Sequence, residues 1–392
     1  MAKGNVLVIH GGAPTAVINA SLYGAVTEAK RHPEVDKVYG AIGGSGGVLK
    51  EAFFDLKQVD DQRLRLLLHT PASAIGTSRD HLTPEDYQTM AEIVGRHNIR
   101  YVLFNGGNGS MDACGKLYQA CQDRGVDVRV VGIPKTIDND IAVTDHAPGF
   151  GSAARYLAAT VKEVSQDVRA LPIHVSIVEA MGRNAGWLVA ASALARDKAG
   201  DGPDLIYLPE RPFDEEQFLE DVQTLHQQKG GVVVVASEGL KDKTGQPIVP
   251  PIFKVGRSVY YGDVSAHLAN LVIQRLGVKA RSEKPGICGR ASSAFQSEVD
   301  RDEAVLAGAE AAKAALEGQT GVMVGFERLP GAQYRCRTIY IPIAEVMLHE
   351  QVVPDHYITP RGNDVTDEFV QWCRPLIGSP LPEFIRFGTL GE

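Results

Sequence analysis

The chain has 392 residues, enough for two or three domains, and its hydrophobic content of 44% is ordinary for a globular protein. Its formal net charge is −8, and no basic stretch is dense enough to suggest a nucleic-acid or membrane-surface footprint. We therefore expect small-molecule partners, with no nucleic acid and no membrane.

The cysteines and the opening residues indicate the compartment. The five cysteines show no metal-ligand spacing, and their odd number does not suggest a disulfide framework. The opening MAKGNVLVIHGG reads as a β-strand rather than a signal peptide, and no segment approaches about 18 uninterrupted apolar residues. We expect a cytoplasmic protein with reduced thiols.

Short apolar runs alternate with amphipathic stretches through the first third of the chain. The pattern predicts strands over NVLVI, KVYGAI, YVLFN and VRVVGI, and helices over about 16–30, 84–97 and 110–123. Thr83 should cap the middle helix, because Pro84 and acidic residues follow it where helix N-termini favour them. This alternation is typical of βαβ units around a parallel sheet.

The same alternation restarts in the middle of the chain. It predicts strands over 174–180, 204–210 and 231–239, and helices over 184–197 and 214–229. Strands that are buried on both faces read as continuous apolar runs, as these do. We therefore expect a second α/β domain after the first.

Glycine-rich loops follow two of the predicted strands. HGGAPTAVINA (10–20) follows the first strand, and GGNGSMD (106–112) follows YVLFN. Glycines let the backbone approach a ligand, and the N-terminus of the next helix favours an anion, so a phosphate site is one interpretation. A simple strand-to-helix turn is the other. The spacing matches neither a Walker A loop nor a dinucleotide fingerprint.

The stretch GIPKTIDNDI (132–141) ends a buried strand with charged residues. Asp138 and Asp140 stand two positions apart, beside Lys135 and Thr136. In an extended segment both carboxylates would lie on one side, where they could bind a substrate hydroxyl and hydrated Mg²⁺. The alternative is a turn in which these side chains only cap local backbone N–H groups.

Further charged residues follow strands of the second half. Arg183 lies in EAMGRNAGW (179–187), and its planar guanidinium suits a phosphate. Glu238 ends a buried strand, and Arg281 and Arg290 flank a Gly-Pro turn. Taken singly, each would be a solvated or ion-paired residue. Together they could hold a sugar hydroxyl and a sugar phosphate.

These motifs, taken together and in order, resemble the 6-phosphofructokinase family, including its pyrophosphate-dependent branch, over roughly residues 5 to 320. The motifs are GG…NA (11–20), IGTSR (75–79), GGNGS (106–110), PKTIDND (134–140), EAMGR (179–183), Glu238 and the Arg281/Arg290 pair. The resemblance implies two Rossmann-like, three-layer α/β domains with the active site in the cleft between them. It also implies Mg²⁺-dependent phosphoryl transfer to the 1-hydroxyl of fructose 6-phosphate, by a homodimer or homotetramer.

On this resemblance we expect a donor-binding domain at 1–149 with roughly 288–325, and a sugar-phosphate domain at 150–287 with roughly 326–392. Asp138 is the implied catalytic base, with Lys135 and Thr136 beside it, and Asn108 and Asp140 are the implied Mg²⁺ ligands. The implied donor contacts are Gly11, Gly12, Arg79, Gly107, Asn108, Gly109 and Ser110. The implied sugar-phosphate contacts are Thr136, Asp138, His174, Met181, Gly182, Arg183, Glu238, Arg281 and Arg290.

The signals for the phosphoryl donor conflict. Pyrophosphate users in the family typically carry Asp at the position of Gly109 and Lys at the position of Lys135. Gly109 leaves room for the α-phosphate of ATP and removes a charge that would repel it, so we expect ATP, with pyrophosphate as the alternative. The tail after about residue 330 resembles the pyrophosphate-type members and keeps that alternative open.

Two other positions depart from the family pattern. Asn108 stands where an acid is usual, so metal binding should rest more on Asp140 and the substrate phosphates. His174 stands where an Arg that reaches across from a neighbouring subunit is common. Two further alternatives stay open, namely another acceptor such as sedoheptulose 7-phosphate, and a non-catalytic sugar-phosphate sensor.

Overall fold

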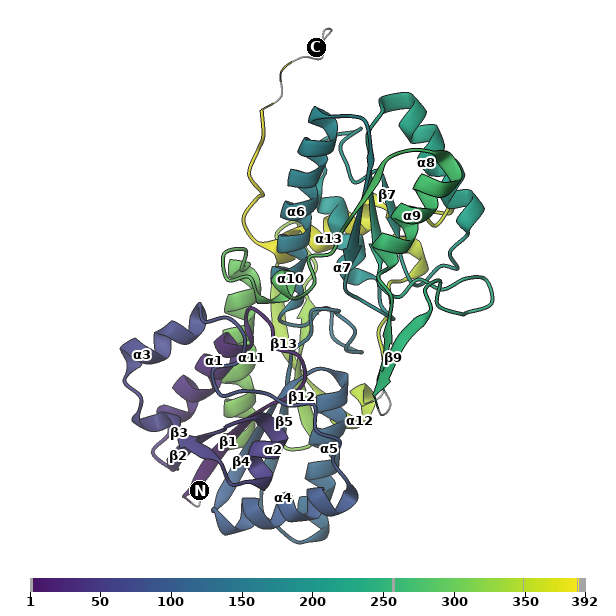
Figure 1. Ribbon diagram of the computed structural model, residues 1–392. Coiled ribbons are helices and arrows are strands. Elements are labelled where there is room, and N and C mark those ends of the chain that lie inside the picture. Colours follow the sequence, from purple (N-terminus) through teal and green to yellow (C-terminus); the bar gives the residue numbers. More distant parts are fainter. Residues whose placement is uncertain (1–2, 256–257, 348, 386, 388–392) are drawn as a thin grey trace.

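The chain folds into two α/β halves, one above the other in Figure 1. The computed structural model describes residues 3–255, 258–347, 349–385 and 387. The lower half is built on a seven-stranded sheet and the upper half on a four-stranded sheet. Helices cover both faces of each sheet, so the predicted fold class, with two Rossmann-like layered units, is confirmed.

The larger sheet has the strand order β13-β12-β5-β4-β1-β2-β3. Its five inner strands are parallel, whereas β3 and β13 run antiparallel to their neighbours at the two edges. The bounds are Gly4–His10 (β1), Val35–Ala41 (β2), Phe53–Asp55 (β3), Ile99–Gly106 (β4), Arg129–Pro134 (β5), Val322–Arg328 (β12) and Cys336–Pro342 (β13).

Two pairs of helices cover this sheet. Helices α1 (Ile18–Lys30) and α11 (Glu298–Leu316) pack on one face, and α4 (Pro84–Arg96) and α5 (Asn108–Asp123) pack on the other. The start of α4 is as predicted, because the Thr83 side chain accepts a hydrogen bond from the backbone N–H of the third helical residue in a reciprocal capping box.

The smaller sheet has the order β11-β6-β8-β7, and all its pairings are parallel. Helices α6 and α7 cover one face and α8 and α9 the other. The bounds are Val175–Ala180 (β6), Leu205–Tyr207 (β7), Val232–Ser237 (β8), Ala280–Glu283 (β11), Phe150–Ala170 (α6), Trp187–Ala191 (α7), Glu215–Lys229 (α8) and Val264–Leu276 (α9).

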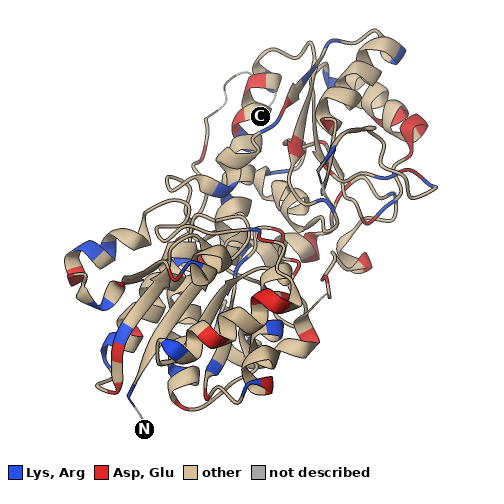
Figure 2. Cartoon of the chain, turned by 60° about the horizontal axis from the view of Figure 1, so that its bottom comes forward, with Lys and Arg blue, Asp and Glu red and all other residues tan. Residues whose placement is uncertain are grey.

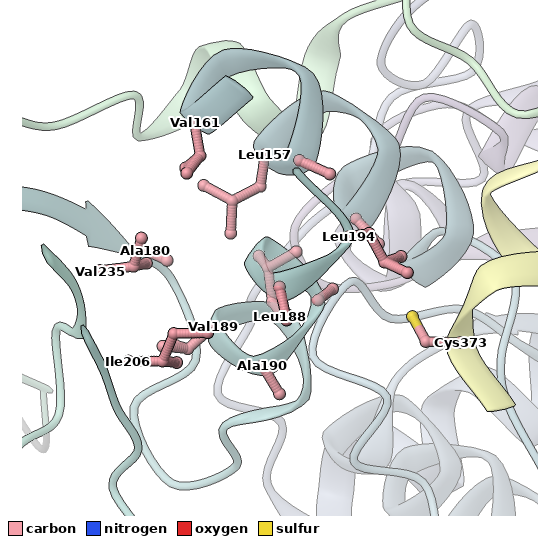
Figure 3. Close-up of a cluster of buried hydrophobic side chains, with 14 of the residues drawn as sticks. Leu157, Val161, Ala180, Leu188, Val189, Ala190, Leu194, Ile206, Val235 and Cys373 are labelled. Atoms are coloured by element: carbon pink, nitrogen blue, oxygen red, sulfur yellow. The ribbon is translucent and has the colours of Figure 1, made fainter. Parts of the chain in front are cut away.

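The core of the upper half includes residues from the C-terminal part of the chain. Figure 3 shows Leu157 of α6 near Leu188 of α7, with Val235 of β8 on one side of them and Cys373 of α13 on the other. The remaining elements are short: α2 (Gly44–Leu49), α3 (Asp61–Arg65), a hairpin of β9 (Pro251–Val255) and β10 (Ser258–Tyr261), α10 (Ile287–Ala291), α12 (Ile343–Val346) and α13 (Asp367–Cys373).

The predicted elements occur where the sequence patterns place them, with two differences. The helix predicted over 184–197 is only α7, which is followed by a 3-10 turn at Ser192–Ala195. The sequence predicted that the chain leaves the lower half for the upper half near residue 325. It leaves later, because β12 and β13 form an antiparallel hairpin that extends the larger sheet to Pro342. A hairpin needs no crossover, so the chain stays with the sheet that β12 has joined.

The charged residues are spread over the molecule, as the absence of dense basic stretches in the sequence predicted. Figure 2 shows acidic and basic residues interspersed over both halves of the chain. None of the helices in the described ranges is long and apolar enough to cross a membrane.

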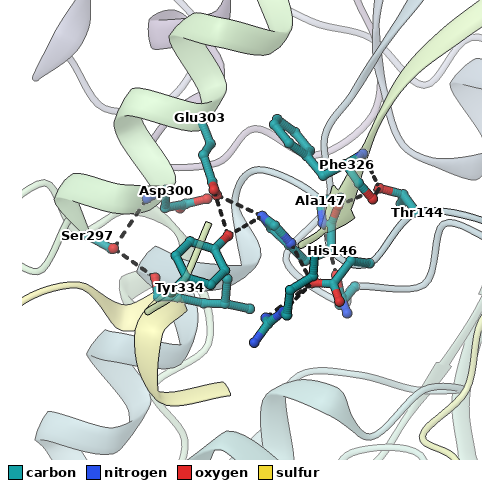
Figure 4. Close-up of polar contacts among 12 residues, drawn as sticks. Thr144, His146, Ala147, Ser297, Asp300, Glu303, Phe326 and Tyr334 are labelled. Atoms are coloured by element: carbon teal, nitrogen blue, oxygen red, sulfur yellow. Dashed lines mark hydrogen bonds and ion pairs between the residues drawn. The ribbon is translucent and has the colours of Figure 1, made fainter. Parts of the chain in front are cut away.

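A buried ionic network fixes the chain where it passes from the lower to the upper half (Figure 4). The His146 ring bonds the Asp145 carboxylate at 2.9 Å and the Glu303 carboxylate at 2.7 Å, and it stacks on Phe326 of β12. Tyr334 donates a further hydrogen bond to Glu303. Burial alone would lower the pKa of His146, but the two carboxylates raise it to about 9.

We predict that His146→Gln destabilises the protein by about 3–5 kcal/mol, because it leaves the largely buried Glu303 carboxylate without its cation, whereas Asp145 keeps the Arg328 guanidinium at 3.1 Å. The raised pKa means that the stabilising charge is fully present below about pH 6.5 and is lost as the pH rises through about 9. The free energy of unfolding, measured in urea over this pH range, should therefore fall with pH in the parent chain more steeply than in the variant.

The matched control is His69→Gln, since His69 is exposed and its replacement should leave the stability within about 0.5 kcal/mol of the parent. Equal stability of the His146 variant and the parent at neutral pH would contradict the role of the network.

Candidate active site

A cavity of about 620 Å³ opens at the carboxyl ends of β1, β4 and β5. Ligands of open α/β sheets bind at this edge. It is lined by all the residues predicted for donor and metal binding, by Lys135 and by three predicted sugar-phosphate contacts: Gly11, Gly12, Arg79, Gly107, Asn108, Gly109, Ser110, Asp140, Lys135, Thr136, Asp138 and Arg290.

The first glycine loop brings the backbone close to other walls of the cavity. A Cβ on Gly11 would lie 2.4 Å from Ser110 Oγ, and Gly12 has a φ of +77°, which glycine adopts at no steric cost. The Gly12 N–H donates to the Ser78 carbonyl at 2.9 Å, so it is not available to a phosphate. This loop therefore shapes the cavity by close approach more than by donating N–H groups.

The second glycine loop forms the N-terminus of α5. Asn108 and Gly109 occupy the first turn of this helix, where backbone N–H groups lack acceptors within the helix and favour an anion. A Cβ on Gly109 would meet nothing within 4 Å, so packing does not require glycine here. The space beside Gly109 can take either a ligand group or a larger side chain.

Lys135 places a cation in the wall of the cavity. Its side chain is buried, and Nζ donates to the Ala13 carbonyl at 2.6 Å. Burial and the neighbouring Arg79 lower the pKa of Lys135 to about 8, against the opposite effect of Asp138. The ammonium group is thus mostly charged at neutral pH and lies in surroundings where its field is little screened.

The stretch from Thr136 to Asp140 is a turn rather than the extended segment that alternation predicted, because Asn139 has a φ of +50°. Thr136 Oγ1 donates to Asp140 Oδ1 at 2.8 Å and accepts from the Asp138 N–H at 3.1 Å. The Asn108 amide donates to Asp140 Oδ2 at 3.0 Å. Both oxygens of Asp140 therefore have side-chain partners.

Asp138 differs from Asp140 in this respect. Its Oδ1 is buried and has no hydrogen-bond partner among the residues that the structure describes. Burial, with Asp140 and then Glu238 as the nearest like charges, raises the pKa of Asp138 to about 7. The alternative in which these side chains only bond backbone N–H groups holds for Asn139, whose Oδ1 accepts from the Ala147 N–H at 3.0 Å. It does not hold for Asp138, whose Oδ1 has no partner among the described residues.

The carboxyl ends of β6 and β8 are followed by four predicted sugar-phosphate residues: Met181, Gly182, Arg183 and Glu238. Met181 and Arg290 line a small cavity that shares a wall with the main one at Ile137. Gly182 has a φ of +117°, and its carbonyl accepts from the side chain of the last residue of β8. Glu238 follows that residue, and burial raises the pKa of Glu238 despite the nearby Arg183.

His174 and Arg281 do not join this cavity. His174 immediately precedes β6, and Arg281 pairs with Ser176, the second residue of that strand. Met181 follows the other end of β6. A strand of six residues is about 20 Å long, which separates the two groups. His174 precedes Val175, which pairs with Ala280, the residue before Arg281, so these two residues lie near each other.

Glu350 is a cavity residue that the sequence patterns missed. It lines the cavity beside Asp138 and Asp140, and its carboxylate accepts from Asn184 Nδ2 at 3.2 Å. It belongs to an irregular stretch between two short helices, where no strand end or glycine loop marks a functional position. Only the three-dimensional path of the chain brings it to the cavity.

A family model described as phosphofructokinase matches residues 5–315. The chain belongs to the phosphofructokinase family. This confirms the resemblance drawn from the motifs, four of which, at 11–20, 75–79, 106–110 and 134–140, contribute residues to the main cavity.

Individual relatives match almost the whole chain. A pyrophosphate–fructose 6-phosphate 1-phosphotransferase of Rhodospirillum rubrum is 37% identical over 98% of this chain and 97% of its own length. A sulfofructose kinase of Alkalicoccus urumqiensis is 33% identical over 96% of each chain. The crystal structure of a pyrophosphate-dependent phosphofructokinase from Marinobacter aquaeolei superimposes with a TM-score of 0.88 at 35% identity, covering 97% of this chain and 94% of that one.

We predict a bell-shaped pH dependence of kcat/KM for phosphoryl transfer. Asp138 can accept a proton only when ionised, so activity should fall as the pH drops below about 7. Lys135 loses its charge as the pH rises through about 8, so activity should fall again above that value. Steady-state assays across both limbs test this, with Lys135→Arg expected to remove the upper limb alone. A flat profile through pH 7 would contradict the assignment of Asp138.

Proposed function

We propose that this chain is a Mg²⁺-dependent phosphotransferase that moves a phosphoryl group from pyrophosphate to the 1-hydroxyl of fructose 6-phosphate. The observation that carries this proposal is the carboxylate of Asp138, which has one buried oxygen with no partner among the described residues and stands between the donor loops and the sugar-phosphate loop. Membership of the family and the names of the full-length relatives support it.

The residues of the chain account for the steps of the reaction. Asp138 takes the proton of the attacking hydroxyl, whose oxygen then forms the new bond to phosphorus while the bond to the leaving phosphate breaks. Lys135 and Arg79 offset the negative charge on the phosphoryl group, and the first-turn N–H groups of α5 add fixed dipoles. Catalysis is then mostly positioning and charge stabilisation.

Asp140 and Asn108 would hold Mg²⁺. The Oδ1 atom of Asn108 is buried without a partner in the described part of the chain, and the carboxylate of Asp140 keeps lone pairs beyond its two hydrogen bonds. The ion, when bound, neutralises charge on the donor phosphates. With one carboxylate and one amide, its affinity rests largely on those phosphates.

Pyrophosphate replaces ATP as our favoured donor. Four relatives that are 34–37% identical over at least 98% of this chain are named for pyrophosphate. The preference for ATP drawn from Gly109 alone is therefore poorly supported. ATP remains the second candidate, because the open space beside Gly109 could admit an α-phosphate.

We propose in addition a cytoplasmic homodimer or homotetramer. The five cysteines are free, which suits a reducing compartment. His174 and Arg281 lie outside the cavity of their own chain, near the exposed apolar residues Leu171 and Ile173. Arg281 is exposed, and this location would let it contact the sugar phosphate of a neighbouring subunit, whereas His174 is buried within its own chain.

The donor is tested by coupled assays with fructose 6-phosphate and Mg²⁺, run separately with pyrophosphate and with ATP. We expect pyrophosphate to give a kcat/KM at least about a hundredfold higher than ATP, a difference of about 2.7 kcal/mol in transition-state binding. Comparable rates, or a preference for ATP, would overturn the proposed donor. Sedoheptulose 7-phosphate and sulfofructose, tested as acceptors in the same assay, separate fructose 6-phosphate from its alternatives.

Two variants at Gly109 distinguish steric exclusion of ATP from charge repulsion. Gly109→Asp should remove residual activity with ATP and keep activity with pyrophosphate, because a carboxylate fills the open space and repels an α-phosphate. Gly109→Asn is the matched control of the same size without the charge. If both variants lose ATP activity equally, the discrimination is steric rather than electrostatic.

A further inference from the structure

A short segment near the C-terminal end of the chain passes between the two halves of the molecule. We call residues 349–353 the strap. Helix α12 before the strap packs against α5 in the lower half, and α13 after it joins the core of the upper half (Figure 1). The strap thus runs past the catalytic turn (136–140) and the loop at 181–187 that carries the sugar-phosphate residues.

The backbone of the strap is bonded to both of these segments. The Gln351 N–H donates to the carbonyl oxygen of Asp140 at 2.8 Å, and the Gln351 carbonyl accepts from Trp187 Nε1 at 3.0 Å. Glu350 also forms an antiparallel bridge with Ile141. A single peptide segment therefore contacts the catalytic turn on one side and the start of α7 on the other.

The half-buried carboxylate of Glu210 fixes the upper end of the strap. One oxygen of Glu210 accepts from the Gly186 N–H at 2.8 Å and from the Val353 N–H at 2.9 Å. The indole of Trp187 packs against that of Trp372 with ring centroids 4.9 Å apart. The strap and the end of the 181–187 loop are consequently held by the same groups.

The side chain of Glu350, which lines the cavity, also contacts the 181–187 loop. Its two carboxylate oxygens lie 3.4 and 3.2 Å from Asn184 Nδ2, and Asn184 is the residue after Arg183. Glu350 lines the same cavity as Asp138 and Arg290. The hydrogen bond from Asn184 directs the Glu350 carboxylate toward the 181–187 loop.

We propose that Glu350 is a positioning residue, which holds the 181–187 loop against the catalytic turn through its bond with Asn184. The loop then presents the sugar phosphate so that its hydroxyl meets Asp138. This inference rests on the proposed function, because it concerns the binding of the phosphoryl acceptor. It predicts that loss of this bond raises KM for the acceptor and has little effect on kcat or on KM for the donor.

The test is a double-mutant cycle in the full-length chain. Glu350→Ala and Asn184→Ala should each raise KM for fructose 6-phosphate by about fivefold to tenfold and change kcat by less than about threefold. The double variant should be no worse than either single one, because both remove the same hydrogen bond. Glu350→Gln should restore KM to near the parent value, since an amide oxygen can still accept from Asn184.

The matched control is Glu345→Ala, because Glu345 is an exposed acid of α12 outside the cavity and its loss should leave KM unchanged. Thermal unfolding of each variant shows that it is folded. In a parent chain that turns over fructose 6-phosphate, unchanged KM in Glu350→Ala, additive effects in the double variant, or failure of Gln to restore KM would each overturn the positioning role alone. No turnover by the parent chain with either donor would overturn the proposed function and this inference together.

Discussion

The unequal sharing of hydrogen bonds in the turn from Thr136 to Asp140 is the constraint on which the site depends. Thr136 and Asn108 occupy both oxygens of Asp140, while Asp138 keeps a buried oxygen without a partner in the described chain. A lone carboxylate in such surroundings binds a proton more tightly than one in water, and Lys135 only partly offsets this. Asp138 is thereby suited to accept a proton near neutral pH, and Asp140 to hold a cation.

A site that combines residues of both halves also needs the two halves to keep a fixed relative position. A displacement of about 1 Å between reacting groups can lower the rate by about a hundredfold. Two arrangements fix this position on either side of the catalytic turn. The His146 network fixes the chain just after the turn, against α11 and β12. The strap fixes the turn itself to the start of α7 through Gln351. Both lie at positions where the chain crosses from one sheet to the other.

The sequence predicted the parts of this site that follow regular elements. Gly109, Lys135 and Asp138 all come directly after buried strands, and parallel strands bring their carboxyl ends to one edge. His174 is the first residue of the strand predicted over 174–180, and so it lies at the amino end of β6, at the opposite edge of the sheet. The direction of the strand was enough to exclude it from the cavity of its own chain.

The remaining features depend on contacts between distant segments. Glu350 comes from an irregular stretch, and Glu303 meets His146 across 157 residues of chain. The left-handed conformation of Asn139 turns a segment that alternation alone would extend. The expectation of ATP is less supported than pyrophosphate for a related reason, since one glycine beside an open cavity shows what could fit there and not what binds.

The most direct test of the central claim is the replacement of Asp138 by Asn, which keeps the size of the side chain and removes its ability to accept a proton. Transfer from pyrophosphate to fructose 6-phosphate can be followed by ³¹P NMR, and binding of fructose 6-phosphate by calorimetry. We expect kcat to fall by about 10²–10⁴ while the affinity for the sugar phosphate stays within a few-fold of the parent. Turnover close to that of the parent chain would contradict the role of Asp138 as the base.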